Sequence, residues 1–132
     1  MKSVIAIAAT VSGLAASSVL VEAKVPQDKV CKAAVAAIMG RDAKIIKIDK
    51  QDGAVTHLSY VRPNDGTLWK YRCKLEGNRV IWASDTGRWR TDALDEEVLF
   101  AVDAASGVTI TQEYTDGSKD EDHFSAKVLA GK

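Results

Sequence analysis

A helical pattern of apolar positions occupies residues 26–39. Apolar side chains recur there at three- and four-residue intervals, which places them on one face of an α-helix: Cys31, Ala34, Val35 and Ile38. Pro26 suits the first turn of a helix, and Gly40 suits the left-handed residue that follows the last turn. The pattern therefore predicts a helix from Pro26 to Met39.

After residue 40 the pattern changes to short runs of β-branched and aromatic residues. Turn residues such as Asp52-Gly53 and Asp116-Gly117 separate these runs. Turns recur about every ten residues, which favours antiparallel hairpins because parallel strands need long crossovers. The expected strands are residues 44–50, 54–62, 67–76, 79–84, 97–103, 108–115 and 123–129.

These elements predict an α+β fold. One N-terminal helix would pack on a curved antiparallel sheet of about seven strands, arranged as a meander. The number of strands does not decide whether the sheet closes partly into a barrel. We expect a single globular domain over residues 24–132, whose 109 residues (132 − 23) are enough for one modest core.

The first 23 residues have the pattern of a secretory signal peptide. Lys2 precedes an apolar run over residues 4–16, and short side chains at Val21 and Ala23 mark a cleavage site after Ala23. The run is shorter than the ~20 apolar residues that a membrane span needs. We therefore expect an exported protein, periplasmic or secreted, with no membrane span after cleavage.

The two cysteines, Cys31 and Cys73, are expected to form a disulfide in an exported protein. The stretch LWKYRCKL, residues 68–75, places Trp69, Tyr71, Cys73 and Leu75 on one side of a strand. Cys31 lies on the apolar face of the helix, so the bond would join helix and sheet and point these residues inward. The alternatives are two buried thiols or a link between chains.

The net charge of zero hides an asymmetry along the chain. Residues 24–90 contain 14 Lys and Arg against 7 Asp and Glu, whereas residues 91–132 contain 3 against 10. The other side of the strand at 68–75 carries a cationic row, Lys70, Arg72 and Lys74. This row is either a solvated face with local ion pairs or a docking surface for an anionic partner.

A second candidate binding segment is SDTGRWRTD, residues 84–92. Arg88, Trp89 and Arg90 combine the residue types that are most frequent at binding hot spots. They lie in the longest stretch without a strand pattern, and long connections in small domains often carry function. In the alternative interpretation, Asp85 and Asp92 bind the arginines while Trp89 packs on the sheet edge.

Motifs for catalysis or cofactors are absent from the sequence. The acidic run Asp120–His123 lacks the alternating oxygen ligands of an EF-hand, and no nucleophile motif, phosphate loop or zinc spacing occurs. We therefore expect no metal and no cofactor. A small envelope hydrolase remains an alternative, with acids among Asp85, Asp92, Asp95 and Glu96 and with His57 as the base.

The leading hypothesis is a small, exported, non-catalytic binding module. Its partner would be an anionic macromolecule or an envelope protein, bound through the cationic and aromatic residues 70, 72, 74 and 88–90. An enzyme inhibitor is one version of this hypothesis. A structural or assembly protein that associates through a sheet edge is a further alternative.

Overall fold

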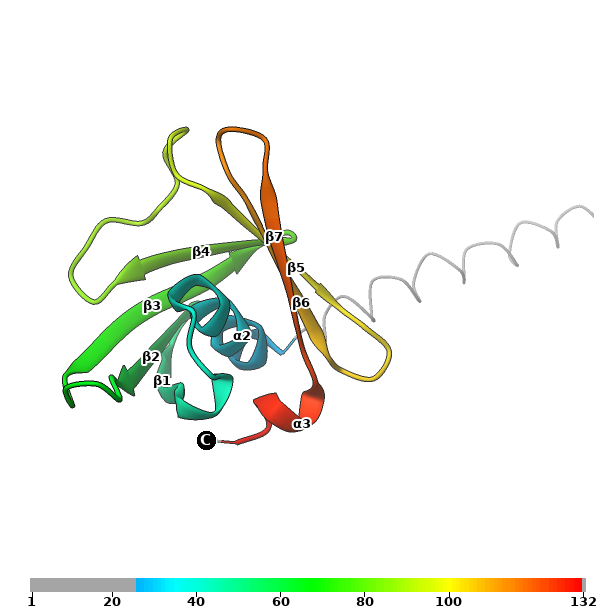
Figure 1. Ribbon diagram of the computed structural model, residues 1–132. Coiled ribbons are helices and arrows are strands. Elements are labelled where there is room, and N and C mark those ends of the chain that lie inside the picture. The colour runs from blue at the N-terminus through cyan, green and yellow to red at the C-terminus, as the bar shows by residue number, and fades with distance from the viewer. Residues whose placement is uncertain (1–25, 132) are drawn as a thin grey trace, which may run out of the picture.

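The computed structural model describes residues 26–131 (Figure 1). The predicted signal peptide, residues 1–23, lies outside the described residues. The helical elements are α2 (Gln27–Met39), the short 3₁₀ helix η1 (Ala43–Ile45) and α3 (Ala126–Leu129). The strands are β1 (Lys47–Asp52), β2 (Val55–Val61), β3 (Leu68–Glu76), β4 (Arg79–Ser84), β5 (Glu97–Val102), β6 (Val108–Glu113) and β7 (Lys119–Phe124).

The strands form one antiparallel sheet whose spatial order is the same as their order along the chain. This confirms the predicted meander with one helix packed on it. The sheet curves around α2, which contacts β1, β2 and β3 as well as β5 and β6 (Figure 1). β1 and β7 are not paired with each other, so the sheet is open rather than closed as a barrel. We call the sheet face that contacts α2 the inner face and the opposite face the outer face.

Helix α2 follows the sequence pattern closely. It starts after Pro26 and ends at Met39, where Gly40 takes the left-handed conformation with φ of 64° and donates its N–H to the last turn. Ala33 and Ala34 are fully buried. Their small side chains allow the helix backbone to lie close to the sheet, so the helix fills the concave side.

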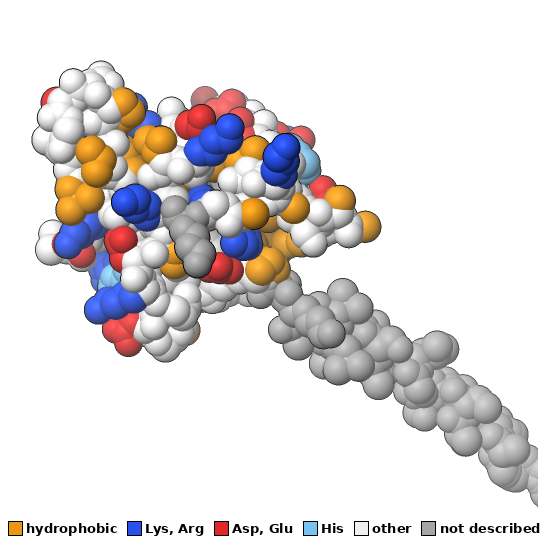
Figure 2. Space-filling model, turned by 90° about the horizontal axis from the view of Figure 1, so that it is seen from below, with side chains coloured by type: hydrophobic (Ala, Val, Ile, Leu, Met, Phe, Trp, Pro, Cys, Tyr) orange, Lys and Arg blue, Asp and Glu red, His pale blue; other side chains and the backbone are white. Residues whose placement is uncertain are grey.

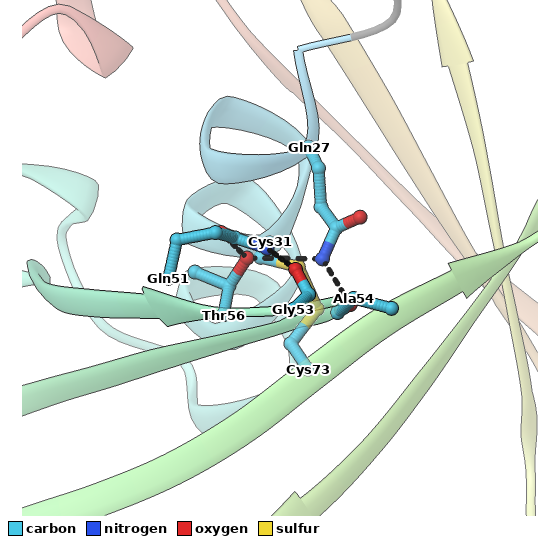
Figure 3. Close-up of a disulfide and its surroundings, with 7 residues drawn as sticks. All are labelled: Gln27, Cys31, Gln51, Gly53, Ala54, Thr56 and Cys73. Atoms are coloured by element: carbon cyan, nitrogen blue, oxygen red, sulfur yellow. Dashed lines mark hydrogen bonds between the residues drawn. A yellow bond between two sulfur atoms is a disulfide. The ribbon is translucent and has the colours of Figure 1, made fainter.

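The predicted disulfide joins Cys31 of α2 to Cys73 of β3, with 5.9 Å between the Cα atoms (Figure 3). Both cysteines are fully buried. Beside the bond, the Gln27 side chain donates to the Ala54 carbonyl at 2.8 Å and to Thr56 Oγ1 at 3.0 Å. The start of α2 is therefore tied to β2 and β3 by one covalent bond and two hydrogen bonds.

Two residues expected in the core are exposed. Trp69 is 39% exposed. Tyr71 already contacts Met39, the last residue of α2, and Trp69 lies two residues closer to the start of β3, beyond the end of the helix. The Trp69 ring packs instead under the guanidinium of Arg62, 4.8 Å from the ring centroid. Alternation along the predicted strand 97–103 likewise points Val102 inward, but this residue, the last of β5, is 37% exposed. The prediction that alternate residues point into the core was therefore wrong where a strand extends past the helix.

The last predicted strand, residues 123–129, was placed too late. β7 covers Lys119–Phe124, and Ser125 then caps α3 by accepting a hydrogen bond from the Val128 N–H. β7 can contain several acidic residues because it is an edge strand, and most of its surface is exposed to solvent. The first strand was also predicted too early, since residues 43–45 form η1.

Lys32 on α2 is buried, although nothing in the sequence pattern distinguishes it. Only 1% of the residue is exposed, and its Nζ donates to the Gly131 carbonyl. Burial lowers the pKa of this ammonium group. The contact holds the end of the described chain against α2, where Leu129 of α3 is also buried.

Candidate functional site

The outer face of β1, β2 and β3 carries two cross-strand rows of polar side chains. In one row Lys47 of β1 pairs with Ser59 of β2, which pairs with Lys70 of β3. In the next row Lys50 pairs with His57, which pairs with Arg72. Each row therefore has Ser59 or His57 on the middle strand and a lysine or arginine on either side of it.

A β-bulge in β1 places both of its lysines on this face. The register shifts between Ile48 and Lys50, which leaves Asp49 as the extra residue. Without this insertion Lys50 would point to the opposite side from Lys47, because side chains alternate along a strand. Asp49 accepts a hydrogen bond from Ser59 Oγ at 3.1 Å. Sequence reasoning missed Lys47 and Lys50, since a bulge has no signal in the hydrophobic pattern.

A hollow of about 500 Å³ lies over these strands, and we call it the trough. Three lysines, two aspartates, a histidine and a serine supply its polar lining: Lys47, Lys50, Lys70, Asp49, Asp85, His57 and Ser59. Within residues 26–131 none of the three lysines has a carboxylate within 4.0 Å. The trough therefore contains three lysines without a direct ion pair, and its two aspartates leave an excess of one positive charge (3 − 2), without counting His57.

The predicted cationic row of β3 does point away from the core, but its three members differ. Lys70 is exposed and lines the trough. Arg72 and Lys74 both lie over the ring of Trp89, each 4.6 Å from its centroid. Arg72 also donates to the carbonyls of Ser84 and Gly87. Arg72 and Lys74 thus hold the 84–92 segment against the sheet.

That segment takes the place of a strand beside β4. β4 and β5 pair only at Arg79 and Val80, and farther along β4 the Arg90 N–H donates to the Trp82 carbonyl at 2.9 Å. Trp89 therefore lies on the outer face, where Ile81 is 1% exposed and Ala83 is fully buried. The Arg90 guanidinium lies 4.9 Å from the ring centroid of the core residue Trp82.

Arg88 is bound within the same connection. Its guanidinium donates two hydrogen bonds to Asp95, at 2.8 and 2.9 Å, and lies 3.5 Å from Asp92. Asp85, which the alternative interpretation paired with these arginines, lines the trough instead. The hydrogen bonds from Arg88 hold the pKa of Asp95 at about 2. Arg88, Trp89 and Arg90 therefore all make contacts inside the protein.

Acidification should weaken the fold through Asp95. The unfolded carboxyl has a pKa of about 3.9 and the folded one of about 2, so the stabilisation is complete above about pH 4 and is lost as the pH falls through about 2. In Asp95→Asn the melting temperature should therefore fall less between about pH 4 and pH 2 than in the wild type. Thermal unfolding followed by circular dichroism across that range measures the difference.

The control for this prediction is Asp92→Asn, which removes a charge from the same connection. The Asp92 side chain is 71% exposed and lies 3.5 Å from Arg88. Its pH profile should follow the wild type. A wild-type profile in Asp95→Asn would contradict a stabilising role for the Arg88–Asp95 pair.

The residues of the hydrolase alternative are divided between two places. His57 and Asp85 line the trough, whereas Asp92 and Asp95 line a second hollow of about 310 Å³ beside Arg79 and Tyr114. His57 is thus not brought together with Asp92 or Asp95. Asp95 is also held ionised by Arg88, which suits an ion-pair partner rather than a general acid.

The acidic run of β7 is engaged in local contacts. Asp120 accepts a hydrogen bond from the Tyr114 hydroxyl at 2.8 Å, and His123 lies 2.9 Å from Asp103. No group of three or more His, Cys, Asp or Glu side chains suited to a metal ion occurs in residues 26–131. The run therefore forms the exposed edge of the sheet.

The basic and acidic halves of the chain are only partly intermixed. Where they meet, Arg79 pairs with Glu97 and Arg88 with Asp95. Figure 2 shows Lys and Arg side chains scattered with Asp and Glu between them, rather than one basic face, on the side of the molecule seen there. Lys44, Lys119 and Lys127 also have no carboxylate within 4.0 Å in the described chain, so what distinguishes the trough is that three such lysines line one hollow.

Comparison with known proteins identifies no functional residue. No helix within residues 26–131 has the length and apolar character needed to cross a membrane. No family model, no curated protein and no solved structure matches this chain.

Proposed function

We propose that this protein is a small, exported, non-catalytic binding module that docks an anionic macromolecule or an anionic protein segment in the trough. The single observation that carries the proposal is the pair of cross-strand rows. Lys47 and Lys70 flank Ser59, and Lys50 and Arg72 flank His57. Export is part of the proposal because of the signal-peptide pattern over residues 1–23.

The charges of the trough favour an anion for an electrostatic reason. Three lysines on neighbouring strands repel one another, and Asp49 and Asp85 offset this repulsion only in part, because neither lies within ion-pair distance of a lysine in the described chain. A bound anion relieves this repulsion, and the hollow brings it near several cations at once. The side chains of Ser59 and His57 add polar groups at the floor.

The 84–92 segment has a positioning role in this proposal. Trp89 fixes Arg72 and Lys74 on the outer face of β3, and Arg72 in turn binds the backbone of the segment. The wall of the trough next to β4 is thereby rigid. Arg88 and Arg90 support that wall through Asp95 and Trp82 and do not contact the ligand.

Two charge-removing variants test the proposed function. Lys47→Ser/Lys70→Ser removes one lysine from each wall, and Lys119→Ser/Lys127→Ser removes two exposed lysines from β7 and α3. The probes are polyglutamate and dextran sulfate, with affinity measured by calorimetry. The first variant should bind each probe about tenfold more weakly than the wild type, the effect of losing about two surface ion pairs.

The control variant has the same net charge as the trough variant, but its two replaced lysines lie outside the trough, so it should bind almost as the wild type does. The affinity of the wild type should also fall as salt is raised. Equal losses in the two variants would mean that the probes respond to net charge alone. That result, or no binding of either probe by the wild type, would overturn the proposed function.

A further inference from the structure

We infer that the trough receives an extended acidic polypeptide segment whose carboxylates fall at every second residue. This inference rests on the proposed function and names the class of partner. It follows from the spacing of the cations along the strands, the distance between the two walls and the side chains at one end of the trough.

The first step is the spacing along the strands. Residues on one face of a strand repeat every two residues, about 6.8 Å in an antiparallel sheet. Lys70 and Arg72 have this spacing on β3, and the bulge gives Lys47 and Lys50 the same facing on β1. Arg72 is held by Trp89 and the 84–92 backbone, so Lys50 is the cation of its row that lines the trough. An extended peptide with carboxylates at alternate positions has the same repeat of about 6.8 Å. Each carboxylate can therefore meet one cross-strand row.

The second step is the width of the trough. Its cationic walls stand on β1 and β3, the two neighbours of β2, so their backbones are about 10 Å apart, twice the ~4.8 Å strand spacing. A single extended chain fits over β2 between these walls. An α-helix, with a diameter of ~10–12 Å including side chains, is too wide to reach the floor. The geometry thus favours an extended segment parallel to β2.

The third step is the absence of a stacking surface. Recognition of single-stranded nucleic acid depends on exposed aromatic faces on which the bases stack. The trough is lined by Tyr60 and Tyr71, but these residues are only 3% and 4% exposed, and their rings stack on each other among the core residues. The Trp89 ring is already covered by Arg72 and Lys74. A polypeptide needs no such surface.

One end of the trough is apolar. Val61 of β2 pairs with Leu68 of β3, and these residues are 51% and 57% exposed. They form the next cross-strand position beyond Ser59 and Lys70. The matching ligand is therefore an alternating acidic run followed by an apolar side chain. A sulfated or carboxylated polysaccharide has no apolar side chain that would use this end in the same way.

Two synthetic peptides of identical composition test the inference. In one, aspartate and serine alternate; in the other, all aspartates form a single block. When extended, the alternating peptide directs every carboxylate toward the trough, whereas the block peptide directs about half of them away. The wild type should bind the alternating peptide about tenfold more tightly, as expected for two additional surface ion pairs. Lys47→Ser/Lys70→Ser should lose this preference.

The apolar end is tested with a leucine added to the end of the alternating peptide. The addition should tighten binding to the wild type but not to Val61→Ser/Leu68→Ser. Because Val61 and Leu68 are exposed, this variant should keep the wild-type melting temperature. Absence of a leucine effect in the wild type would contradict the seating of an apolar residue there.

The outcomes separate this inference from the proposed function. Equal affinity for the two peptides would overturn the inference that the ligand is an alternating acidic segment. If Lys47→Ser/Lys70→Ser still weakened polyglutamate binding, the proposed anion-binding function would be retained. Tighter binding of dextran sulfate than of the alternating peptide, at equal charge concentration, would assign the trough to a polysaccharide. No binding of any of the polyanions would overturn both.

Discussion

Removing the disulfide with Cys31→Ala/Cys73→Ala is expected to lower the free energy of unfolding by about 4 kcal/mol. The bond joins residues 42 apart in the sequence, and opening it releases that loop in the unfolded chain. For a domain of this size the loss corresponds to a fall of roughly 20 °C in the melting temperature. Urea unfolding and a thermal scan, each on the wild type and the variant, measure the two quantities.

The double variant is the appropriate comparison because a single replacement leaves an unpaired thiol in the core. Both cysteines are fully buried, so added reductant reaches the bond only when the protein opens. The far-ultraviolet circular dichroism at low temperature should stay close to the wild type, since α2 keeps its apolar face and the hydrogen bonds from Gln27. An unchanged urea midpoint in the double variant would contradict the stapling role.

The disulfide matters to the trough through the geometry of the sheet. An isolated helix of 13 residues is marginal in water, so α2 depends on its contacts with the sheet. Cys73 pairs with Thr56 of β2 and with Trp82 of β4, at the centre of the curved region. The bond therefore fixes the inner parity of β3, and with it the outward direction of Lys70 and Arg72.

Much of the fold follows from local patterns in the sequence. The helix bounds agree with the structure because Pro26 and Gly40 are strong boundary signals. The strands between residues 55 and 113 agree within about two residues, since each is bounded by turn chemistry. The disulfide was predictable because Cys31 and Cys73 each lie on the apolar side of their own element.

The parts that could not be predicted depend on contacts between distant segments. The exposure of Trp69 depends on where α2 ends over β3, which alternation along one strand does not contain. Lys47 and Lys50 share a face only because of the bulge at Asp49. The sequence drew attention to Arg88, Trp89 and Arg90, but their partners became evident only in three dimensions.

Replacing Trp89 with alanine should have the second largest effect, a loss of about 3 kcal/mol in the free energy of unfolding. The half-buried ring covers the outer face of β4, where Ile81 and Ala83 are buried apart from the main core. Its loss exposes apolar surface and removes the contacts of Arg72 and Lys74 with the ring, each worth about 0.5–1 kcal/mol. Urea unfolding of the wild type and Trp89→Ala measures the change.

Trp69→Ala is the matched control, because Trp69 also packs under an arginine, Arg62, at 4.8 Å. Trp69 is 39% exposed and lies past the end of α2, so its replacement should cost less than about 1 kcal/mol. Similar losses in the two variants would mean that the stacked cation, and not the covered apolar surface, determines the stability of each site.

The Trp89 variant also separates the two interpretations of the 84–92 segment. If Trp89 only supports the wall of the trough, folded Trp89→Ala should still bind polyglutamate within about twofold of the wild type, because Lys47, Lys50 and Lys70 are retained. If Trp89 contacts the partner directly, affinity should fall further than in Lys47→Ser/Lys70→Ser, as expected for a hot-spot aromatic residue. Stability and affinity measured on the same sample therefore assign this tryptophan to the fold or to the binding surface.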